Sequence, residues 1–297
     1  MKQDRVIALG FFDGVHIGHA ALLNRAREMA VQLDCHSAAL TFDNHPDELV
    51  FGRPTPLINT LPDRRRMMAR NFQLDEILSI PFDRTLMETP WETFVTELLA
   101  RRLRAVHVVC GHDFTFGFRG EGNPRKLQAK CAELGVGCDV IPKVEYQGVT
   151  VSSTLIRKLL QEGNVEEANA LLGHRHFITG TVVYGKQMGR QMGIPTANLR
   201  LPEGILCPAK GVYVTEVVLE DGRRYCAVTN VGRCPTTEIE TGTTIESWLL
   251  DFRGDLYHQN IRVEFCTFLR PEQKFESMEI LREEILRNAE QTREYFR

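Results

Sequence analysis

The first half of the chain alternates short apolar runs, rich in β-branched residues, with longer segments whose apolar positions recur at helical spacing. The apolar runs are RVIALGF, HSAALTF, DEILSI, AVHVVCG and CDVIPKV; the helical segments are HAALLNRAREMAVQL, PDRRRMMARNF, PWETFVTELLARRL and NPRKLQAKCAELG. This alternation predicts an α/β domain with a Rossmann-like, doubly wound parallel sheet. Ligands of such sheets bind beyond the carboxyl ends of the strands.

From His174 the pattern changes to longer β-rich segments separated by turns, with an Asp221-Gly222 hairpin signal between two of them. One helical run, SMEILREEILRNAEQTREYF, closes the chain. We therefore expect a small antiparallel β-barrel followed by a C-terminal helix. Two short helices around Gly163-Asn164 precede the barrel, which predicts one domain over residues 1–173 and a second over 174–297.

Composition limits the classes of function. The 297 residues carry a net charge of -3, which argues against a nucleic-acid partner, because such binding needs clustered Lys and Arg. The eight cysteines contain no CxxC pair, as expected of thiols in a reducing compartment. The first residues hold too short an apolar run for a signal peptide, and no window approaches the ~18 apolar residues of a membrane span. We expect a cytoplasmic protein that has no membrane partner.

The segment LGFFDGVHIGHAALL joins the first predicted strand to the first predicted helix. His16, Gly18 and His19 therefore lie at a helix N-terminus, where free N–H groups and the helix dipole favour an anion. Imidazoles there can donate hydrogen bonds to phosphate oxygens, and Gly18 would let a ligand approach the backbone. In isolation the same residues are also compatible with ordinary polar positions near a helix start.

Further polar residues follow other strands. Asp43 and His45 follow the second strand, and Asp113 and Arg119 lie in a Gly-rich aromatic turn after a later one. VSSTLIR opens a helix with three hydroxyls and Arg157, which predicts a second anion cradle, although the serines are also good N-caps. The acidic segment VEEANALL that follows argues against a DNA-reading helix-turn-helix.

The second half holds a glycine-rich segment, GKQMGRQMGIPTANLRLP. Its three glycines and Pro195 favour a loop over a helix, and its Lys and Arg make a phosphate-binding loop plausible; the residues are Gly185, Lys186, Gly189, Arg190 and Gly193. A P-loop NTPase is rejected, because Gln187 stands where the metal-binding Ser or Thr would be.

Two neutral oxygens follow this loop. Thr196 and Asn198 point to the same side of an extended segment and could bind Mg²⁺ that is also held by nucleotide phosphates. Taken alone, the four residues PTAN favour a Pro-Thr turn with a capping Asn, but the neighbouring glycines weaken that interpretation.

Glu246 is the most informative single residue of this half. In a strand it would share a face with Trp248, Leu250 and Phe252, which puts a carboxylate on the apolar side of the barrel. Because a buried unpaired charge is costly, Glu246 either reaches water at the barrel rim or is kept as a general base.

Four motifs of the first half, GFFDGVHIGH, TFDNHP, GHDFTFGFRGEGN and VSSTLIR, together resemble the nucleotidyltransferase module of the bacterial bifunctional riboflavin kinase/FAD synthetases. The resemblance implies that FMN phosphate attacks the α-phosphorus of ATP, giving FAD and pyrophosphate. It implies catalytic roles for His16, His19 and Arg157. The implied binding residues are Gly10, Phe12, Asp13, Gly18, Asp43, His45, Asp113, Phe114, Ser152, Ser153 and Thr154. Phe11 is a departure, since many members have Asn there.

The second half resembles the riboflavin kinase module of the same family, through GKQMGRQMGIPTANL, KGVYVTEV, TNVGRCPT, ESWLLDF and FLRPEQKF. The resemblance implies that Glu246 deprotonates the terminal ribityl hydroxyl of riboflavin and that Thr196 and Asn198 bind metal and nucleotide. It also implies that the loop from Gly185 to Gly193 covers the ATP phosphates, with Pro195 among the binding residues. Trp248 and Asn288 depart from the family pattern, where His and Asp are common.

The sequence therefore predicts a bifunctional enzyme that phosphorylates riboflavin and adenylylates FMN. Its ligands would be riboflavin, FMN, FAD, ATP, ADP and pyrophosphate, with Mg²⁺ or another divalent cation, and we expect a monomer or weak homo-oligomer. Another nucleotidyltransferase, acting on phosphopantetheine or glycerol phosphate, would leave Glu246 without a role. A flavin-binding regulator is the alternative from another class, but the complete set of chemical residues argues against it.

Overall fold

The computed structural model describes residues 4–185, 189, 193–233 and 243–297. The chain forms two compact units, Met1–Ser153 and Thr154–Arg297. The sequence-based boundary after Gly173 lies further along the chain, beyond two short helices. In the structure the second of these helices is bonded to the barrel, because the Asn169 amide donates to the carbonyl of Phe265 at 2.9 Å. How the two activities divide along the chain stays a prediction.

The first unit contains a five-stranded parallel sheet in the order β3-β2-β1-β4-β5, as the sequence predicts. Its strands are β1 (Arg5–Leu9), β2 (His36–Phe42), β3 (Glu76–Ile80), β4 (Ala105–Gly111) and β5 (Gly137–Ile141). Its helices are α1 (Ile17–Gln32), α2 (Pro46–Phe51), α3 (Leu61–Asn71), α4 (Arg84–Met87), α5 (Trp91–Thr93), a π-helix (Phe94–Arg102) and α6 (Pro124–Glu133). A two-stranded hairpin, β6 (Glu145–Tyr146) and β7 (Val149–Thr150), follows.

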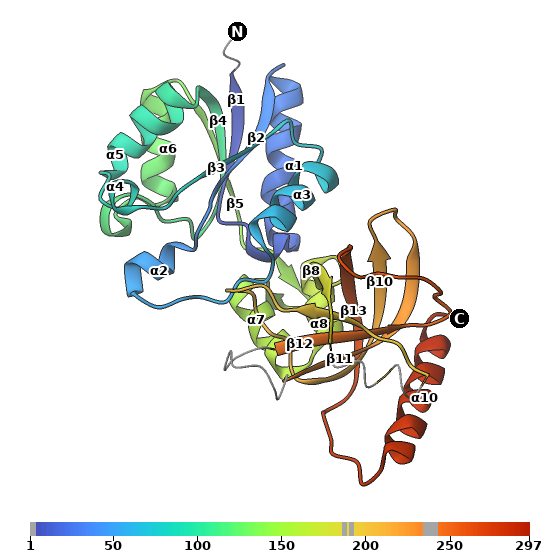
Figure 1. Ribbon diagram of the computed structural model, residues 1–297. Coiled ribbons are helices and arrows are strands. Elements are labelled where there is room, and N and C mark those ends of the chain that lie inside the picture. Colours follow the sequence, from blue (N-terminus) through green and yellow to red (C-terminus); the bar gives the residue numbers. More distant parts are fainter. Residues whose placement is uncertain (1–3, 186–188, 190–192, 234–242) are drawn as a thin grey trace. The chain divides into compact units, whose positions relative to one another are not determined.

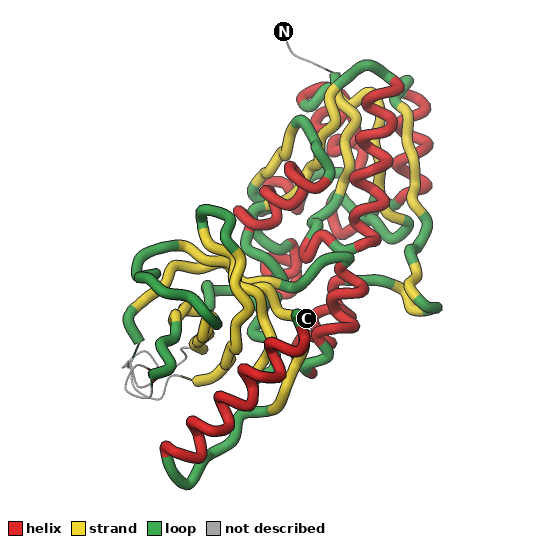
Figure 2. Tube along the Cα trace, turned by 90° about the vertical axis from the view of Figure 1, so that its right-hand side faces the viewer, coloured by secondary structure: helices red, strands yellow, loops and turns green. Residues whose placement is uncertain are grey.

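The strands of this sheet are mostly apolar because helices cover both faces. Figure 1 shows α1 and α3 on one face and α4, α5 and α6 on the other, and Figure 2 shows the strands in yellow between red helices. One buried cluster joins Ile7, Leu40 and Val108 of the strands to Leu99 and Leu127 of the covering helices. The chain order reverses between β1 and β4, so the edge beyond their carboxyl ends is the expected ligand site.

The second unit contains a closed antiparallel barrel in the order β10-β11-β12-β9-β8-β13. Its strands are β8 (Phe177–Val183), β9 (Ala197–Arg200), β10 (Gly211–Leu219), β11 (Arg224–Arg233), β12 (Thr243–Leu249) and β13 (Asn260–Arg270). Its helices include α7 (Ser153–Glu162), α8 (Val165–Leu172) and α10 (Met278–Tyr295). The Asp221-Gly222 hairpin is confirmed between β10 and β11, with Gly222 at φ 87°.

The barrel interior combines apolar side chains with a buried chain of hydroxyls. Thr229 bonds to Thr215 at 2.6 Å and to Ser247 at 2.8 Å, and all three side chains are fully buried. A second apolar cluster lies between the barrel and α10, where Ala289 packs with Val212, Val228, Trp248 and Leu250. The fold class predicted from the sequence is therefore confirmed in both units. Within the described part of the chain, no helix combines the length and apolarity needed to cross a membrane.

Candidate active sites

The turn that follows β1 is strained. Phe12, Gly14 and Val15 have φ values of 60°, 78° and 44°. Left-handed backbone is unfavourable for Phe and for β-branched Val, and such strain is typical of functional sites. The turn delivers His16 to the N-cap of α1, beyond the carboxyl end of the central strand.

His16 and His19 lie side by side at this helix N-terminus. Their rings stack with centroids 3.6 Å apart, and Nδ1 of His16 accepts the backbone N–H of His19 at 3.2 Å. A Cβ at Gly18 would lie 3.0 Å from the His16 ring, so glycine makes room for this ring; ligand approach at Gly18 stays a prediction. Burial, then the neighbouring His16 and Arg64, hold the pKa of His19 well below its usual 6.5. His19 is therefore a neutral donor and acceptor at pH 7.

Asp13 connects this turn to two other segments. Its buried carboxylate accepts the backbone N–H of Ile58 at 2.9 Å and of Asn59 at 3.4 Å. Its carbonyl accepts the hydroxyl of Ser153 at 2.9 Å. Ser153 therefore contacts the FFDG turn, and the Asp13 carboxylate holds the backbone that precedes α3.

Four more of the predicted residues lie in this turn or after β2: Gly10, Phe12, Asp43 and His45. Phe12 is fully buried and meets the His19 ring edge to face at 5.3 Å, and a Cβ at Gly10 would lie 3.0 Å from the Phe12 ring. Asp43 is exposed and accepts the Ser79 hydroxyl. His45 caps α2 by accepting the N–H of Asp47 at 3.1 Å.

The remaining predicted residues of this site have different surroundings. Asp113 is exposed after β4, whereas Phe114 stacks on Phe116 with centroids 5.4 Å apart. Ser152 precedes α7, and Thr154 and Arg157 lie on that helix in the second unit. A common ligand for Arg157 and the two histidines therefore stays a prediction.

Sequence reasoning missed Arg64, on α3. This side chain is fully buried, donates to the carbonyl of Phe42 at 2.7 Å, and places its guanidinium 4.1 Å from the centroid of Phe11. Within PDRRRMMARNF it is one of three successive arginines, and the sequence does not show which of them is buried.

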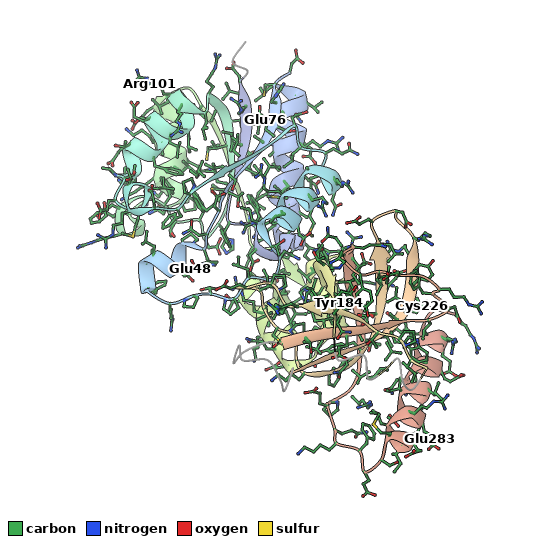
Figure 3. The ribbon with its side chains drawn as sticks, in the orientation of Figure 1. Glu48, Glu76, Arg101, Tyr184, Cys226 and Glu283 are labelled. Atoms are coloured by element: carbon green, nitrogen blue, oxygen red, sulfur yellow. The ribbon has the colours of Figure 1, made fainter. Side chains whose placement is uncertain are left out.

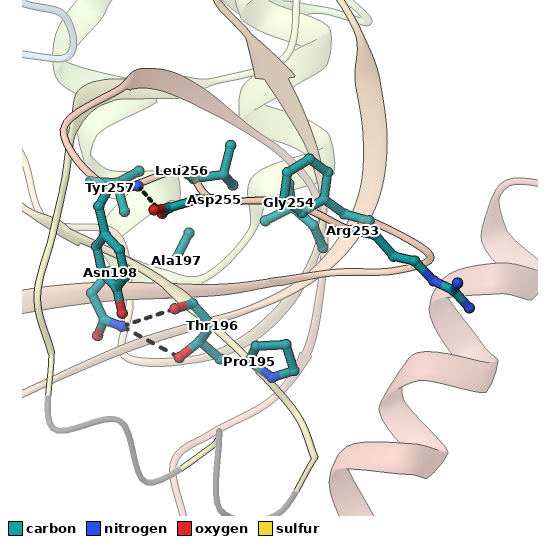
Figure 4. A pocket seen from close by; sticks show the side chains of 12 residues that line it. Pro195, Thr196, Ala197, Asn198, Arg253, Gly254, Asp255, Leu256 and Tyr257 are labelled. Carbon is teal, nitrogen blue, oxygen red and sulfur yellow. Dashed lines mark hydrogen bonds between the residues drawn. The ribbon is translucent and has the colours of Figure 1, made fainter.

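In the second unit Thr196 and Asn198 are brought together, as the sequence predicts. The Asn198 amide donates to the Thr196 carbonyl at 3.3 Å and to its hydroxyl at 3.4 Å (Figure 4). Asn198 is 9% exposed, so its amide oxygen is held in a defined position. This arrangement leaves a hydroxyl and an amide oxygen close together beside a cavity.

Glu246 stands in a row of polar residues across three strands. On β12 it pairs directly with Asn198 of β9 on one side and Asn230 of β11 on the other. Directly opposed residues of an antiparallel sheet point to the same face. Two amides therefore flank the carboxylate; Asn230 was not among the predicted residues.

The face that carries Glu246 differs from the expectation. Ile245, Ser247 and Leu249 are the buried positions of β12, whereas Glu246 and Trp248 are half-buried on the opposite face. That face is apolar around Trp248 because α10 covers the outside of the barrel there. Phe252 is not part of it, since it follows the strand and lines a cavity. The shared face of Glu246 and Trp248 was predicted correctly, whereas the covering of that face by α10 was not foreseen.

A cavity of about 390 Å³ lies beside this row. It is lined by Pro195, Thr196 and Asn198 and by the segment Phe252–Tyr257 (Figure 4). Tyr257, which lines the cavity, stacks on the exposed Tyr184 with ring centroids 4.0 Å apart (Tyr184 is labelled in Figure 3). The sequence analysis did not identify the segment after Phe252, which contains Arg253, Gly254 and Asp255 and is separated from the end of β12 by three residues.

The glycine-rich segment is described only in part. A Cβ at Gly185 would lie 2.6 Å from Cγ of Asn198, and one at Gly189 would collide with the carbonyl oxygen of Ile194. Gly193 has φ 74°. Lys186 and Arg190 lie outside the described residues, so their predicted phosphate contacts stay predictions.

A parallel sheet with a strained strand-to-helix turn, joined to a closed barrel with a polar row beside a cavity, defines a nucleotide-dependent transferase with two domains. Comparison with protein families matches FAD synthetase over residues 1–155 and riboflavin kinase over residues 172–296. The chain belongs to the family of bifunctional riboflavin kinase/FMN adenylyltransferases.

Relatives of that description match almost the whole chain. The protein from Listeria monocytogenes is 34% identical over 99% of this chain and 93% of its own length. That from Escherichia coli K12 is 34% identical over 99% of this chain and 94% of its own length. A crystal structure from Streptococcus pneumoniae, described as a macrolide-efflux protein, has a TM-score of 0.87 at 29% identity and covers 99% of this chain and 95% of that chain.

The family establishes the two reactions. The protein phosphorylates riboflavin to FMN with ATP and adenylylates FMN to FAD with ATP. Riboflavin, FMN, ATP and FAD are therefore its substrates and products.

Proposed function

We propose that FMN adenylylation takes place at the N-terminus of α1, with His16 and His19 as its central groups. The observation that carries this assignment is their stacked pair at the switch point of the sheet. The attacking FMN phosphate is already an anion, so this reaction needs no strong base. Neutral imidazoles and the helix N–H groups would stabilise charge that moves onto the departing pyrophosphate.

Around this pair we place the other predicted ligand contacts. Ser152, Ser153, Thr154 and Arg157 would hold phosphate oxygens. The turn itself is shaped by Gly10, Phe12, Asp13 and Gly18. Phe12 and Asp13 are buried and contact other protein groups, which supports a structural role for them and not direct contact with the ligand. Asp43, His45, Asp113 and Phe114 follow strand ends and would contact nucleotide or flavin.

For riboflavin phosphorylation we propose Glu246 as the general base. An alcohol is a weak nucleophile, so the terminal ribityl hydroxyl must lose its proton as it attacks the γ-phosphorus of ATP, which releases ADP. The half-buried position of Glu246, between two amides and near the cavity, supports this role. Asn198 and Asn230, its direct neighbours in the sheet, would orient the carboxylate.

The same surroundings would suit Mg²⁺. The Thr196 hydroxyl and the Asn198 amide oxygen are hard oxygen donors, and Mg²⁺ commonly takes one or two protein ligands and completes its shell with water and substrate phosphates. Within the described residues no group of three or more His, Cys, Asp or Glu side chains could hold a metal. The metal would neutralise charge on the ATP phosphates.

We extend the proposal to the loop and to the setting. Gly185, Gly189 and Gly193, with Lys186, Arg190 and Pro195, would cover the ATP phosphates. We further propose a cytoplasmic protein that acts as a monomer or weak homo-oligomer and has no nucleic-acid partner, in line with its net charge of -3.

The metal assignment can be tested on the full chain. Riboflavin or FMN is incubated with ATP at graded Mg²⁺, and flavins are separated by chromatography over time. Thr196→Ala and Asn198→Ala should each raise the Mg²⁺ concentration needed for FMN formation, by tenfold or more, and leave FAD formation from FMN unchanged. Thr181→Ala, at an exposed barrel threonine, is the control. An unaltered Mg²⁺ dependence in both variants would refute the assignment.

A further inference from the structure

Arg64 is fully buried, whereas most arginine side chains in proteins are exposed to solvent. It lies on α3, with the guanidinium covering the Phe11 ring at 4.1 Å. Phe11 in turn meets the His45 ring edge to face at 4.5 Å. Arginines are rarely buried unless their charge and donors are matched.

The donors of Arg64 are only partly used. Nη2 donates to the carbonyl of Phe42, whereas Nε and Nη1 are buried and have no hydrogen-bond partner among the residues that the structure describes. Burial lowers the pKa of Arg64 to about 10, and the nearby Asp13 and Asp43 carboxylates oppose that shift. The group is therefore a cation at neutral pH. Buried unsatisfied donors in a native protein call for an explanation such as a ligand.

Other unsatisfied polar atoms lie close to it. Within the described part of the chain, Nδ1 of His19 and both side-chain polar atoms of Asn59 are buried without a hydrogen-bond partner. Asn59 adjoins Asp13 through its backbone N–H, and the charge of Arg64 contributes to the lowered pKa of His19. Arg64 and His19 thus lie near each other and near Asp13, beyond the carboxyl ends of β1 and β2. A cation with free donors, an amide and an imidazole together suit an oxyanion.

We propose that Arg64 is a further phosphate-binding residue of the adenylyl-transfer site, donating to a substrate phosphate from the N–H groups that have no partner within the described residues. The guanidinium holds these donors in one rigid plane, and its charge strengthens a hydrogen bond to a phosphate oxygen. Stacking on Phe11 and the bond to Phe42 hold that plane in place before the substrate arrives. Both ATP and FMN carry phosphates, and the chemistry of Arg64 is the same toward either. This inference rests on the proposed placement of that site at His16 and His19.

The test uses Arg64→Met and Arg64→Lys in the full chain, with Arg65→Met as the matched control on the exposed side of α3. FAD formation is measured with ATP varied at saturating FMN, then with FMN varied at saturating ATP. Inhibition by inorganic pyrophosphate is measured in parallel. Riboflavin phosphorylation and the melting temperature report folding.

We expect Arg64→Met to raise one KM, or to lower kcat/KM, at least tenfold, with riboflavin phosphorylation retained. Arg64→Lys keeps the charge but loses the planar arrangement of donors, so it should recover part of the loss. An increase confined to KM for ATP, with weaker pyrophosphate inhibition, assigns the contact to the nucleotide; an increase confined to KM for FMN assigns it to the flavin phosphate.

Unchanged kinetics in Arg64→Met would overturn the proposal. So would a loss of FAD formation that follows melting temperature alone and is equal in the Met and Lys variants, because Arg64 would then only anchor the end of β2. His19→Ala separates the two claims: if it leaves FAD formation intact, the site assignment fails; if it abolishes FAD formation while Arg64 variants do not change it, only this inference fails.

Discussion

The hydroxyl of Ser153 donates a 2.9 Å hydrogen bond to the main-chain carbonyl of Asp13, across 140 positions of sequence. The bond joins the first turn after β1 to the start of α7. It fixes the backbone three residues before His16 through a hydroxyl of the VSSTLIR motif. The bond thus links the first residue of α7 to the turn that carries the proposed adenylyl-transfer site.

Removing that hydroxyl should therefore weaken adenylyl transfer. Ser153→Ala loses a bond of about 1 kcal/mol, and we expect FAD formation to fall by about fivefold or more as the turn loosens. Riboflavin phosphorylation should be unchanged, and Ser153→Thr should retain most of the FAD activity. Steady-state assays of the two reactions on each variant check this; equal losses in both reactions would contradict a role at this site.

Gly185 is expected to control riboflavin phosphorylation through Asn198. A methyl group at Gly185 would lie 2.6 Å from Cγ of Asn198, so Gly185→Ala must displace that amide. We expect at least a tenfold loss of FMN formation and none of FAD formation from FMN. A double-mutant cycle is decisive, because Gly185→Ala should add nothing to Asn198→Ala if the two act together. Additive losses would show that Gly185 acts elsewhere.

His176 should make the barrel sensitive to acid. Its ring is fully buried against Phe265, and burial, aided by His174, lowers its pKa to about 3. The folded pKa lies below the unfolded value of about 6.5, so the stabilisation is present above pH 6.5 and is lost as pH falls toward 3.

The expected slope is about 1.4 kcal/mol per pH unit in that window. Urea unfolding of the wild type and of His176→Phe between pH 4 and 7 measures it. The variant should lose this part of the pH dependence, whatever its absolute stability. An identical slope in both proteins would mean that His176 is not buried in its neutral form.

The sequence predicts the fold well where one local pattern determines each element. The segments HSAALTF and AVHVVCG are strands with the predicted ends, because full burial on both faces leaves a continuous apolar run. The face of β12 was harder to infer. Period-two alternation shows that Glu246 and Trp248 share a face, but it does not show that α10 makes the outer face apolar.

The site was predictable where the chemistry lies in a contiguous motif. His16, Gly18 and His19, and Thr196 with Asn198, are close in sequence and are together in the structure. Arg64 was not predictable, because its importance comes from burial against Phe11 and Phe42, which only the packing of α3 determines. Asn230 likewise joins Glu246 only through the register of β11 and β12.

The most direct test of two separate active sites is to assay His19→Ala and Glu246→Gln in parallel. Each variant receives ATP and Mg²⁺ with either riboflavin or FMN, and products are separated by chromatography. The account predicts that His19→Ala still forms FMN but no FAD, whereas Glu246→Gln forms FAD from added FMN but leaves riboflavin unchanged. If either variant, still folded by its melting temperature, kept the reaction assigned to its site, that assignment would be contradicted.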